Sequence, residues 1–373
     1  MKKILVFICV FVLALFFSVS AKAAVYDEFL KESSPDEVFD SLPDNARSAL
    51  NDLGIKGFDY SAFKNIKPDR IINRILDTAA KESKNPLKAF CSVLAVLLLY
   101  SVLYSVKNFA QTTLQPVLSL IVTLCICCAL VIPLTGFIEN TVNVIKSSSD
   151  FMLAYVPLMV FALGLSGHPV SGAGYYGIMI FTGQAVGRIA SRIVAPFMKI
   201  FLAVGISSAI SPNINLSGIV RFISKYTRII LIFSVSIFTG VLGFKQVLDM
   251  GADSLSSKAV RLSLSSFVPV IGSALSEAYR TVQGSVGLLK SGIGIVSILA
   301  LIAVYAPVLI QCLFWMLALG VSKAAGEVLN LREPCILLES VYTVVSTLFS
   351  VILCMIMIFI ISSTVVIMLG GFG

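Results

Sequence analysis

The sequence predicts an all-α polytopic membrane protein that carries a small extracytoplasmic helical module. Of its 373 residues, 57% are hydrophobic and only 13% are charged. Ordinary soluble domains are roughly 45–50% apolar and about 25% charged, so this composition excludes both a soluble enzyme and a disordered chain. Several apolar runs are long enough to cross roughly 30 Å of hydrocarbon as helices, and others are short and interrupted by Gly and Pro.

Residues 1–23 predict a signal peptide. A basic start, Met1-Lys2-Lys3, precedes the apolar residues 4–17, and Ala21-Lys22-Ala23 fits the A-x-A cleavage pattern. Because the apolar run is short for a span, cleavage after Ala23 is favoured over an uncleaved first transmembrane helix. The chain that follows then begins outside the cytoplasm.

Residues 24–88 predict an extracytoplasmic helical module. The segment is rich in charge and holds no cysteine, and Pro68-Asp69 is a typical helix start. An apolar stripe at helical spacing follows, at Ile71, Ile72, Ile75, Leu76 and Ala79. A module of about 65 residues without disulfides is marginally stable alone, so we expect it to pack on the membrane body or on a partner.

Residues 89–138 predict a transmembrane helix pair, with spans at 89–106 and 117–138. The next residues, 139–150, hold one Lys and two acids. External loops are poor in Lys and Arg, so this composition favours an external loop.

The remaining chain predicts two membrane units on either side of an amphipathic helix. Residues 147–244 contain short apolar runs broken by Gly and Pro, which fit either re-entrant, discontinuous helices or kinked full spans. Residues 245–262 predict an interfacial helix or a helix that packs on a partner. Residues 263–369 form the second unit.

The two units resemble each other and predict an internal repeat, of the kind found in transporter folds. The matches keep their order and lie 112, 111 and 115 residues apart: Val156-Pro157 with Val268-Pro269, Ala195-Pro196 with Ala306-Pro307, and residues 202–209 with 317–324.

The sequence predicts no catalytic, cofactor or metal site and no binding of nucleic acid. Gly164-Leu165-Ser166-Gly167 is similar to the GxSG of intramembrane serine proteases, but such a protease needs a histidine base from another helix. The only histidine, His168, follows two residues after the serine, which favours an exposed turn between membrane segments. Since no nucleotide-binding motif occurs, any energy source belongs to a partner.

Residues 267–294 contain the main candidates for a transport pathway or a subunit contact. Their apolar part is short and Pro269 breaks it, while hydroxyl and amide side chains make it unusually polar. Such a segment is costly in contact with lipid, so it either lines a wet cavity or is a surface loop with snorkelling charges. The candidates, with Glu339 added as a charge beside an apolar run, are Pro157, Pro269, Gly272, Ser276, Thr281, Gly284, Lys290 and Glu339.

The same segment resembles the stage III sporulation protein AE family of endospore-forming Firmicutes. The likeness rests on Phe267-Val268-Pro269-Val270-Ile271-Gly272, Ser276, Thr281-Val282-Gln283-Gly284 and Leu288-Leu289-Lys290. The resemblance implies a multi-pass protein of the mother-cell membrane around the forespore. It also implies partners in a channel, or feeding tube, that include an ATPase and ring-forming subunits. The family has no established catalytic residues, so none is transferred.

These observations favour a permease-like membrane subunit of that channel, needed for sporulation and late forespore gene expression. Two alternatives stay open. The repeat and the broken segments also fit a free-standing secondary transporter of a small solute, and the amphipathic helix and polar module also fit a non-conducting scaffold.

The signal peptide generates a prediction about topology. A cysteine introduced as Ser61→Cys is expected to react with a membrane-impermeant thiol reagent in intact protoplasts, since the module is predicted to lie outside. The parent chain measures the background from its own cysteines. Labelling that requires permeabilised membranes would show that the module is cytoplasmic.

Overall fold

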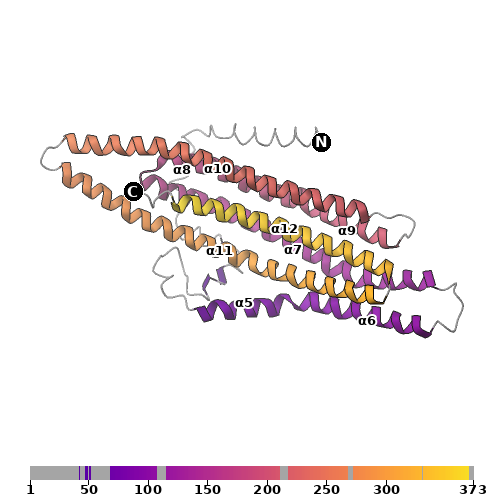
Figure 1. Ribbon diagram of the computed structural model, residues 1–373. Coiled ribbons are helices and arrows are strands. Elements are labelled where there is room, and N and C mark those ends of the chain that lie inside the picture. The colour runs from indigo at the N-terminus through magenta and orange to yellow at the C-terminus, as the bar shows by residue number, and fades with distance from the viewer. Residues whose placement is uncertain are drawn as a thin grey trace, which may run out of the picture.

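The computed structural model is built of helices, and no strand occurs in the part of the chain that it describes (Figure 1). That part comprises residues 42, 47, 48, 50, 51, 68–106, 115–210, 217–267, 272–329 and 331–368. The helices are α5 (Pro68–Glu82), α6 (Lys84–Val106), α7 (Gln115–Leu165), α8 (Pro169–Ile189), the π-helix η4 (Ala190–Val194), α9 (Ala195–Ile210), α10 (Ser217–Phe267), α11 (Gly272–Val328) and α12 (Arg332–Met368).

The helices run along one common axis and form a long antiparallel bundle (Figure 1). The ends of α6, α9 and α11 lie at the right of the view, beside the starts of α7, α10 and α12. Six stretches are long and apolar enough to cross a membrane: Lys84–Val102, Ser119–Gly164, Pro169–Ser207, Phe222–Leu255, Gly294–Val328 and Arg332–Ile367. The predicted class, an all-α polytopic membrane protein, is confirmed.

The helices are longer than the sequence suggested. Helix α7 has 51 residues and continues through residues 139–150, so the external loop expected there is wrong. Pro133 and Pro157 both lie inside this helix, because a membrane helix can lose one backbone hydrogen bond to proline when its neighbours enclose it. The apolar stretch of α7 has 46 residues and is about 69 Å long at 1.5 Å per residue.

The short segments expected between Pro157 and residue 210 are likewise parts of long helices. Helices α8, η4 and α9 follow one another without a break from Pro169 to Ile210, which favours full spans over re-entrant ones. The π-helix includes Arg192 and widens the backbone locally where a long helix must adjust its register.

A tight turn joins α7 to α8, as predicted. Gly167 has a φ of 87°, a left-handed conformation that favours glycine. His168, expected to be exposed, is half-buried, and its Nδ1 lies 3.9 Å from Oδ2 of Asp253 on α10. The turn is therefore covered by a helix that lies more than eighty residues further along the chain.

Asp253 caps the N-terminus of α8. The backbone N–H groups of Val170 and Ser171 donate to its two carboxylate oxygens, each at 2.9 Å. The first N–H groups of a helix have no partner within the helix, and an acidic side chain satisfies them and the positive end of the helix dipole. The cap fixes the end of α8 against α10.

The predicted amphipathic helix, residues 245–262, lies in the second half of α10. Its acidic side chains are buried and two of its leucines are exposed, which is the reverse of the arrangement in a soluble protein. Asp249 and Asp253 are buried, with 6% and 0% exposure, whereas Leu248 and Leu255 are 57% and 72% exposed. Lys245 pairs with Asp249 at 3.0 Å. A Cβ on Gly174 of α8 would collide with the Asp249 carboxylate, so α8 and α10 approach closely at this glycine.

The internal repeat stays a prediction. Helices α10 and α12 begin at Ser217 and Arg332, which are separated by the same 115 residues as the third sequence match. The first match falls partly outside the described residues, because Pro157 is inside α7 and Pro269 is not among the residues that the structure describes.

The cap on α8 generates a stability prediction. Asp253→Ala removes both acceptors, so we expect the free energy of unfolding to fall by about 1–3 kcal/mol, as for a lost charged hydrogen bond at a helix N-terminus. Thermal unfolding of the purified chain in detergent measures the change. Lys258→Ala, an exposed position on the same helix, is the control and should unfold like the parent. Equal melting temperatures for both variants would show that the cap contributes nothing.

Candidate functional site

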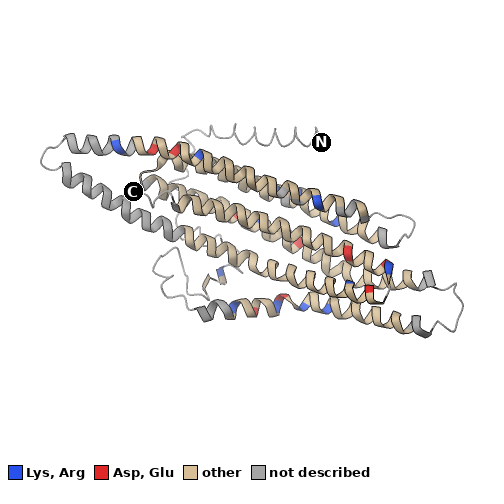
Figure 2. Cartoon of the chain, viewed as in Figure 1, with Lys and Arg blue, Asp and Glu red and all other residues tan. Residues whose placement is uncertain are grey.

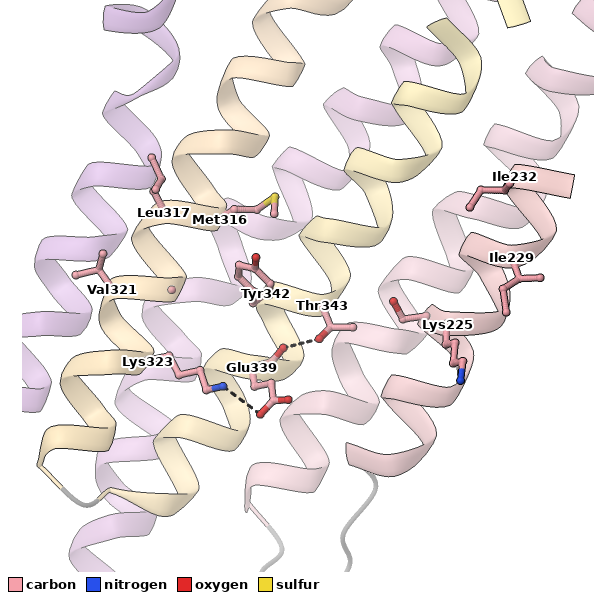
Figure 3. Close-up of a pocket in the computed structure, with 12 residues that line it drawn as sticks. Lys225, Ile229, Ile232, Met316, Leu317, Val321, Lys323, Glu339, Tyr342 and Thr343 are labelled. Carbon is pink, nitrogen blue, oxygen red and sulfur yellow. Dashed lines mark hydrogen bonds and ion pairs between the residues drawn. The ribbon is translucent and has the colours of Figure 1, made fainter. Parts of the chain in front are cut away.

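A hollow with a volume of about 840 Å³ lies between α10, α11 and α12 (Figure 3). We call it the α10–α12 pocket. Its residues come from the start of α10, the end of α11 and the start of α12, and are Ser224, Lys225, Ile229, Ile232, Met316, Leu317, Gly320, Val321, Lys323, Glu339, Tyr342 and Thr343.

An ion pair between two helices borders the pocket. Nζ of Lys323 on α11 lies 3.4 Å from Oε2 of Glu339 on α12 and 3.5 Å from Oε1 of Glu327, one turn further along α11. Figure 3 shows the Lys323–Glu339 pair beside the hydrogen bond from Thr343 to the backbone oxygen of Glu339, at 2.8 Å. The side chains of Lys323 and Glu339 are 33% and 41% exposed, so the pair borders open space.

The chain brings these charges together through a short connection. Helix α11 ends at Val328 and α12 begins at Arg332, and the N–H of Leu331 donates to the oxygen of Gly326 at 2.9 Å. A Cβ on Gly326 would lie 2.8 Å from Sγ of Cys335, so the two helices touch directly beside the turn. Lys323 and Glu339 therefore face each other close to this turn.

Lys225 lines the opposite wall, on α10. Its side chain is exposed, and it forms no ion pair with any described residue. Figure 2 shows the setting of these charges: α10 and α12 have long stretches of uncharged residues along the middle of the bundle, and the charges of α12 all lie near its start, Arg332, Glu333 and Glu339. The pocket lies where such an end meets an apolar stretch.

A second, smaller cavity of about 360 Å³ continues along α10 and α12. It shares Ile232 with the first, so the two hollows adjoin along α10 and α12, and together they are called the groove. The other residues of the second hollow are Val235, Ser236, Ser350, Leu353, Cys354 and Met357. The groove thus has charges at one end and apolar walls beyond them. This arrangement can bind an elongated molecule with one charged end.

Of the predicted site residues, only Glu339 lies in the pocket. Pro157 is buried inside α7, and Pro269 lies outside the described residues. Gly272, Ser276, Thr281, Gly284 and Lys290 belong to the first part of α11. The surface-loop interpretation of this segment is wrong from Gly272 onward, because the backbone there is a continuous helix.

The candidates do not form one site. Lys290 and Lys323 lie on the same helix, 33 residues apart, which corresponds to about 50 Å. Glu339 is beside Lys323, so it is far from the Gly272–Lys290 segment. Lys323 and Tyr342 were not predicted from the sequence. The signal for Lys323 was its spacing of four residues from Glu327, which predicts a pair within one helix and not the contact with another helix.

The GxSG segment is a helix end in the structure. Ser166 donates its hydroxyl hydrogen to the backbone oxygens of Ala162 and Leu163, at 2.9 and 3.0 Å. That bond satisfies the last turn of α7, which is the ordinary role of a serine at this position. Among the described residues, no three His, Cys, Asp or Glu side chains lie close enough to hold a metal ion.

Buried hydroxyl groups join the helices at several levels of the bundle. Ser224 and Thr347 join α10 to α12 at 2.9 Å, Tyr175 and Ser362 join α8 to α12 at 2.9 Å, and Ser148 bonds to Tyr305 between α7 and α11. In an apolar medium such bonds hold helices together and set their register.

The fold and the groove define a class: a multi-pass helical membrane protein with an elongated groove between α10, α11 and α12. The chain belongs to the stage III sporulation protein AE family, whose family model matches residues 60–370. The stage III sporulation protein AE of Bacillus subtilis (strain 168) is 23% identical over 288 residues, which cover 76% of this chain and 69% of that protein. No solved structure matches. Family membership assigns the chain a role in sporulation, and the family is not one of known enzymes.

The ion pair generates a prediction about coupling between α11 and α12. Lys323→Ala and Glu339→Ala should each lower the free energy of unfolding slightly. The double variant should lose less stability than the two single variants added together, with a coupling energy of about 0.5–1 kcal/mol for a partly exposed pair. Thermal unfolding of the four forms measures this cycle. Lys323→Ala with Arg332→Ala is the control cycle, because Arg332 forms no pair with Lys323. Strictly additive losses for Lys323 and Glu339 would contradict the contact.

Proposed function

We propose that the protein is a permease-like membrane subunit of the channel between mother cell and forespore. The observation that carries the proposal is the family match over residues 60–370 together with six helices long enough to cross a membrane. A protein with a role in sporulation and this architecture is suited to connect two compartments through a membrane. The expected location is the mother-cell membrane around the forespore, and late forespore gene expression would depend on it.

The proposal includes an ATPase and ring-forming proteins as partners. The sequence holds no nucleotide-binding motif of its own, so transport driven by nucleotide hydrolysis would need another subunit. The exposed apolar side chains on α10, among them Phe244, Leu248 and Leu255, offer contact area for membrane or protein neighbours.

Two other functions are supported by particular observations. The α10–α12 pocket and the predicted internal repeat favour a free-standing secondary transporter. The long hairpin of α10 and α11 (Figure 1) favours a scaffold that recruits other subunits. A transporter should move solute when it is reconstituted alone. A channel subunit should co-purify with partners from sporulating cells. A scaffold should also co-purify with partners, but the assembled complex should show no solute flux.

The first part of α11 generates the test in cells. If this segment contacts the pathway or another subunit, Gly284→Leu or Lys290→Glu should reduce a late forespore reporter at least tenfold while protein level and membrane insertion stay normal. Gly251→Leu and Lys258→Glu on α10 are matched controls, since a side chain at Gly251 meets no atom within 4 Å and Lys258 is exposed. Normal sporulation in both α11 variants would refute the assignment of this segment.

A further inference from the structure

We propose that the groove between α10 and α12 binds one phospholipid with an anionic headgroup, its phosphate at Lys225 and one acyl chain along the groove. The inference stands on the geometry of this groove and is independent of the role in the sporulation channel. The experiment below therefore measures lipid binding and not sporulation.

The groove is slightly longer than one membrane leaflet is thick. It runs along α12 from Glu339 to Met357, an interval of 18 residues that corresponds to about 27 Å of helix. One leaflet, headgroup included, is about 20–22 Å thick. A single phospholipid can therefore lie along the groove from its charged end to its apolar end.

The walls of the groove are apolar and uncovered. Ile229 and Ile232 on α10 are 50% and 69% exposed, and Leu317 on α11 and Met357 on α12 are 64% and 49% exposed. No part of the described chain covers them. An acyl chain would satisfy this surface, because it offers dispersion contacts and no polar group that needs a partner.

The charges lie at one end of the groove and at the depth of lipid headgroups. Lys225 is three residues from the start of the apolar stretch Phe222–Leu255, and Lys323 is five residues from the end of Gly294–Val328. These intervals correspond to about 5 and 8 Å, and a lysine so close to the end of a span extends its ammonium to the interface. Tyr342, which borders the same pocket, is a residue type enriched at this depth.

The pairing of the charges favours an anionic over a zwitterionic headgroup. Lys323 is balanced by Glu339 and Glu327, so Lys225 is the lysine at this end of the groove that a lipid phosphate can neutralise. A zwitterionic headgroup would bring an ammonium that needs a carboxylate, and Glu339 is already in contact with Lys323. Phosphatidylglycerol, which has a phosphate diester and no ammonium, matches this arrangement.

The test measures lipid retained by the purified full chain. The protein is titrated with phosphatidylglycerol in neutral detergent, and bound lipid is counted by native mass spectrometry, with phosphatidylcholine as the comparison lipid. We expect one tightly bound phosphatidylglycerol and at least tenfold weaker retention of phosphatidylcholine. Lys225→Glu should weaken phosphatidylglycerol binding about tenfold or more, since it removes one cation and adds one anion.

Matched variants separate the groove from general effects. Lys258→Glu reverses an exposed lysine on the same helix outside the groove and should bind lipid like the parent. Ile229→Trp fills the groove and should abolish the tight site, whereas Ile230→Trp, at a neighbouring position that is 43% exposed and does not line it, should preserve it.

Three results would overturn the proposal. The first is equal phosphatidylglycerol binding by Lys225→Glu and Lys258→Glu. The second is equal retention of the two lipids by the parent. The third is a disulfide-linked dimer through Ile229→Cys in a membrane, which would make the groove an interface between two copies of the chain.

Discussion

Helix α12 packs against α7, α9, α10 and α11, and this packing positions the described spans. Its buried side chains are mostly valine and leucine at helical spacing, including Leu338, Val341, Val345, Leu348 and Ile352. Lipid is as apolar as these side chains, so their removal from lipid gives little driving force, and close complementary packing has to hold the helices together. The neighbours of α12 match that need, since α11 presents Trp315 and Cys312 fully buried against the bundle.

Hydrogen bonds between buried hydroxyl groups add direction to this packing. The Ser224–Thr347, Tyr175–Ser362 and Ser148–Tyr305 contacts involve five different helices, with α12 joined to both α10 and α8 and α7 joined to α11. Each hydroxyl would be costly to bury alone, so a slip of one residue along a helix would leave several unsatisfied. The same holds at Asp253, whose buried carboxylate accepts hydrogen bonds from two backbone N–H groups of α8. Packing decides that the helices associate, and these polar contacts decide the register at which they do.

The groove is a consequence of this arrangement. Ser224 is buried against Thr347, so the start of α10 is held to α12, while Ile229 and Ile232 on its outer wall stay exposed. The turn between α11 and α12 then sets Lys323 and Glu339 at the mouth of the same hollow. A binding surface with one charged end thus results from contacts that belong to the bundle itself, which connects the stability of the fold to whatever the groove holds.

The sequence by itself determined the class of protein. Apolar enrichment, charge depletion and the residues around Gly284 were sufficient to predict a helical membrane protein similar to the sporulation family, because composition and local motifs need no knowledge of contacts. It also indicated the turn at Gly167, because the small residues around that glycine interrupt the apolar runs on either side. It did not give the helix lengths, since proline and short polar runs end a helix in water but not inside a bundle that encloses them.

Only the tertiary structure decided which faces lie inside. Periodicity shows that residues 245–262 have two faces, and the usual rule places the apolar one in the core. In a membrane protein the surroundings are apolar as well, so Leu248 and Leu255 can lie outside. The buried Asp253 accepts hydrogen bonds from α8, and the buried Asp249 pairs with Lys245 of its own helix. The contact between Lys323 and Glu339 was equally beyond the sequence, because it depends on how α12 packs back against α11, where the two helices approach closely at Gly326 and Cys335.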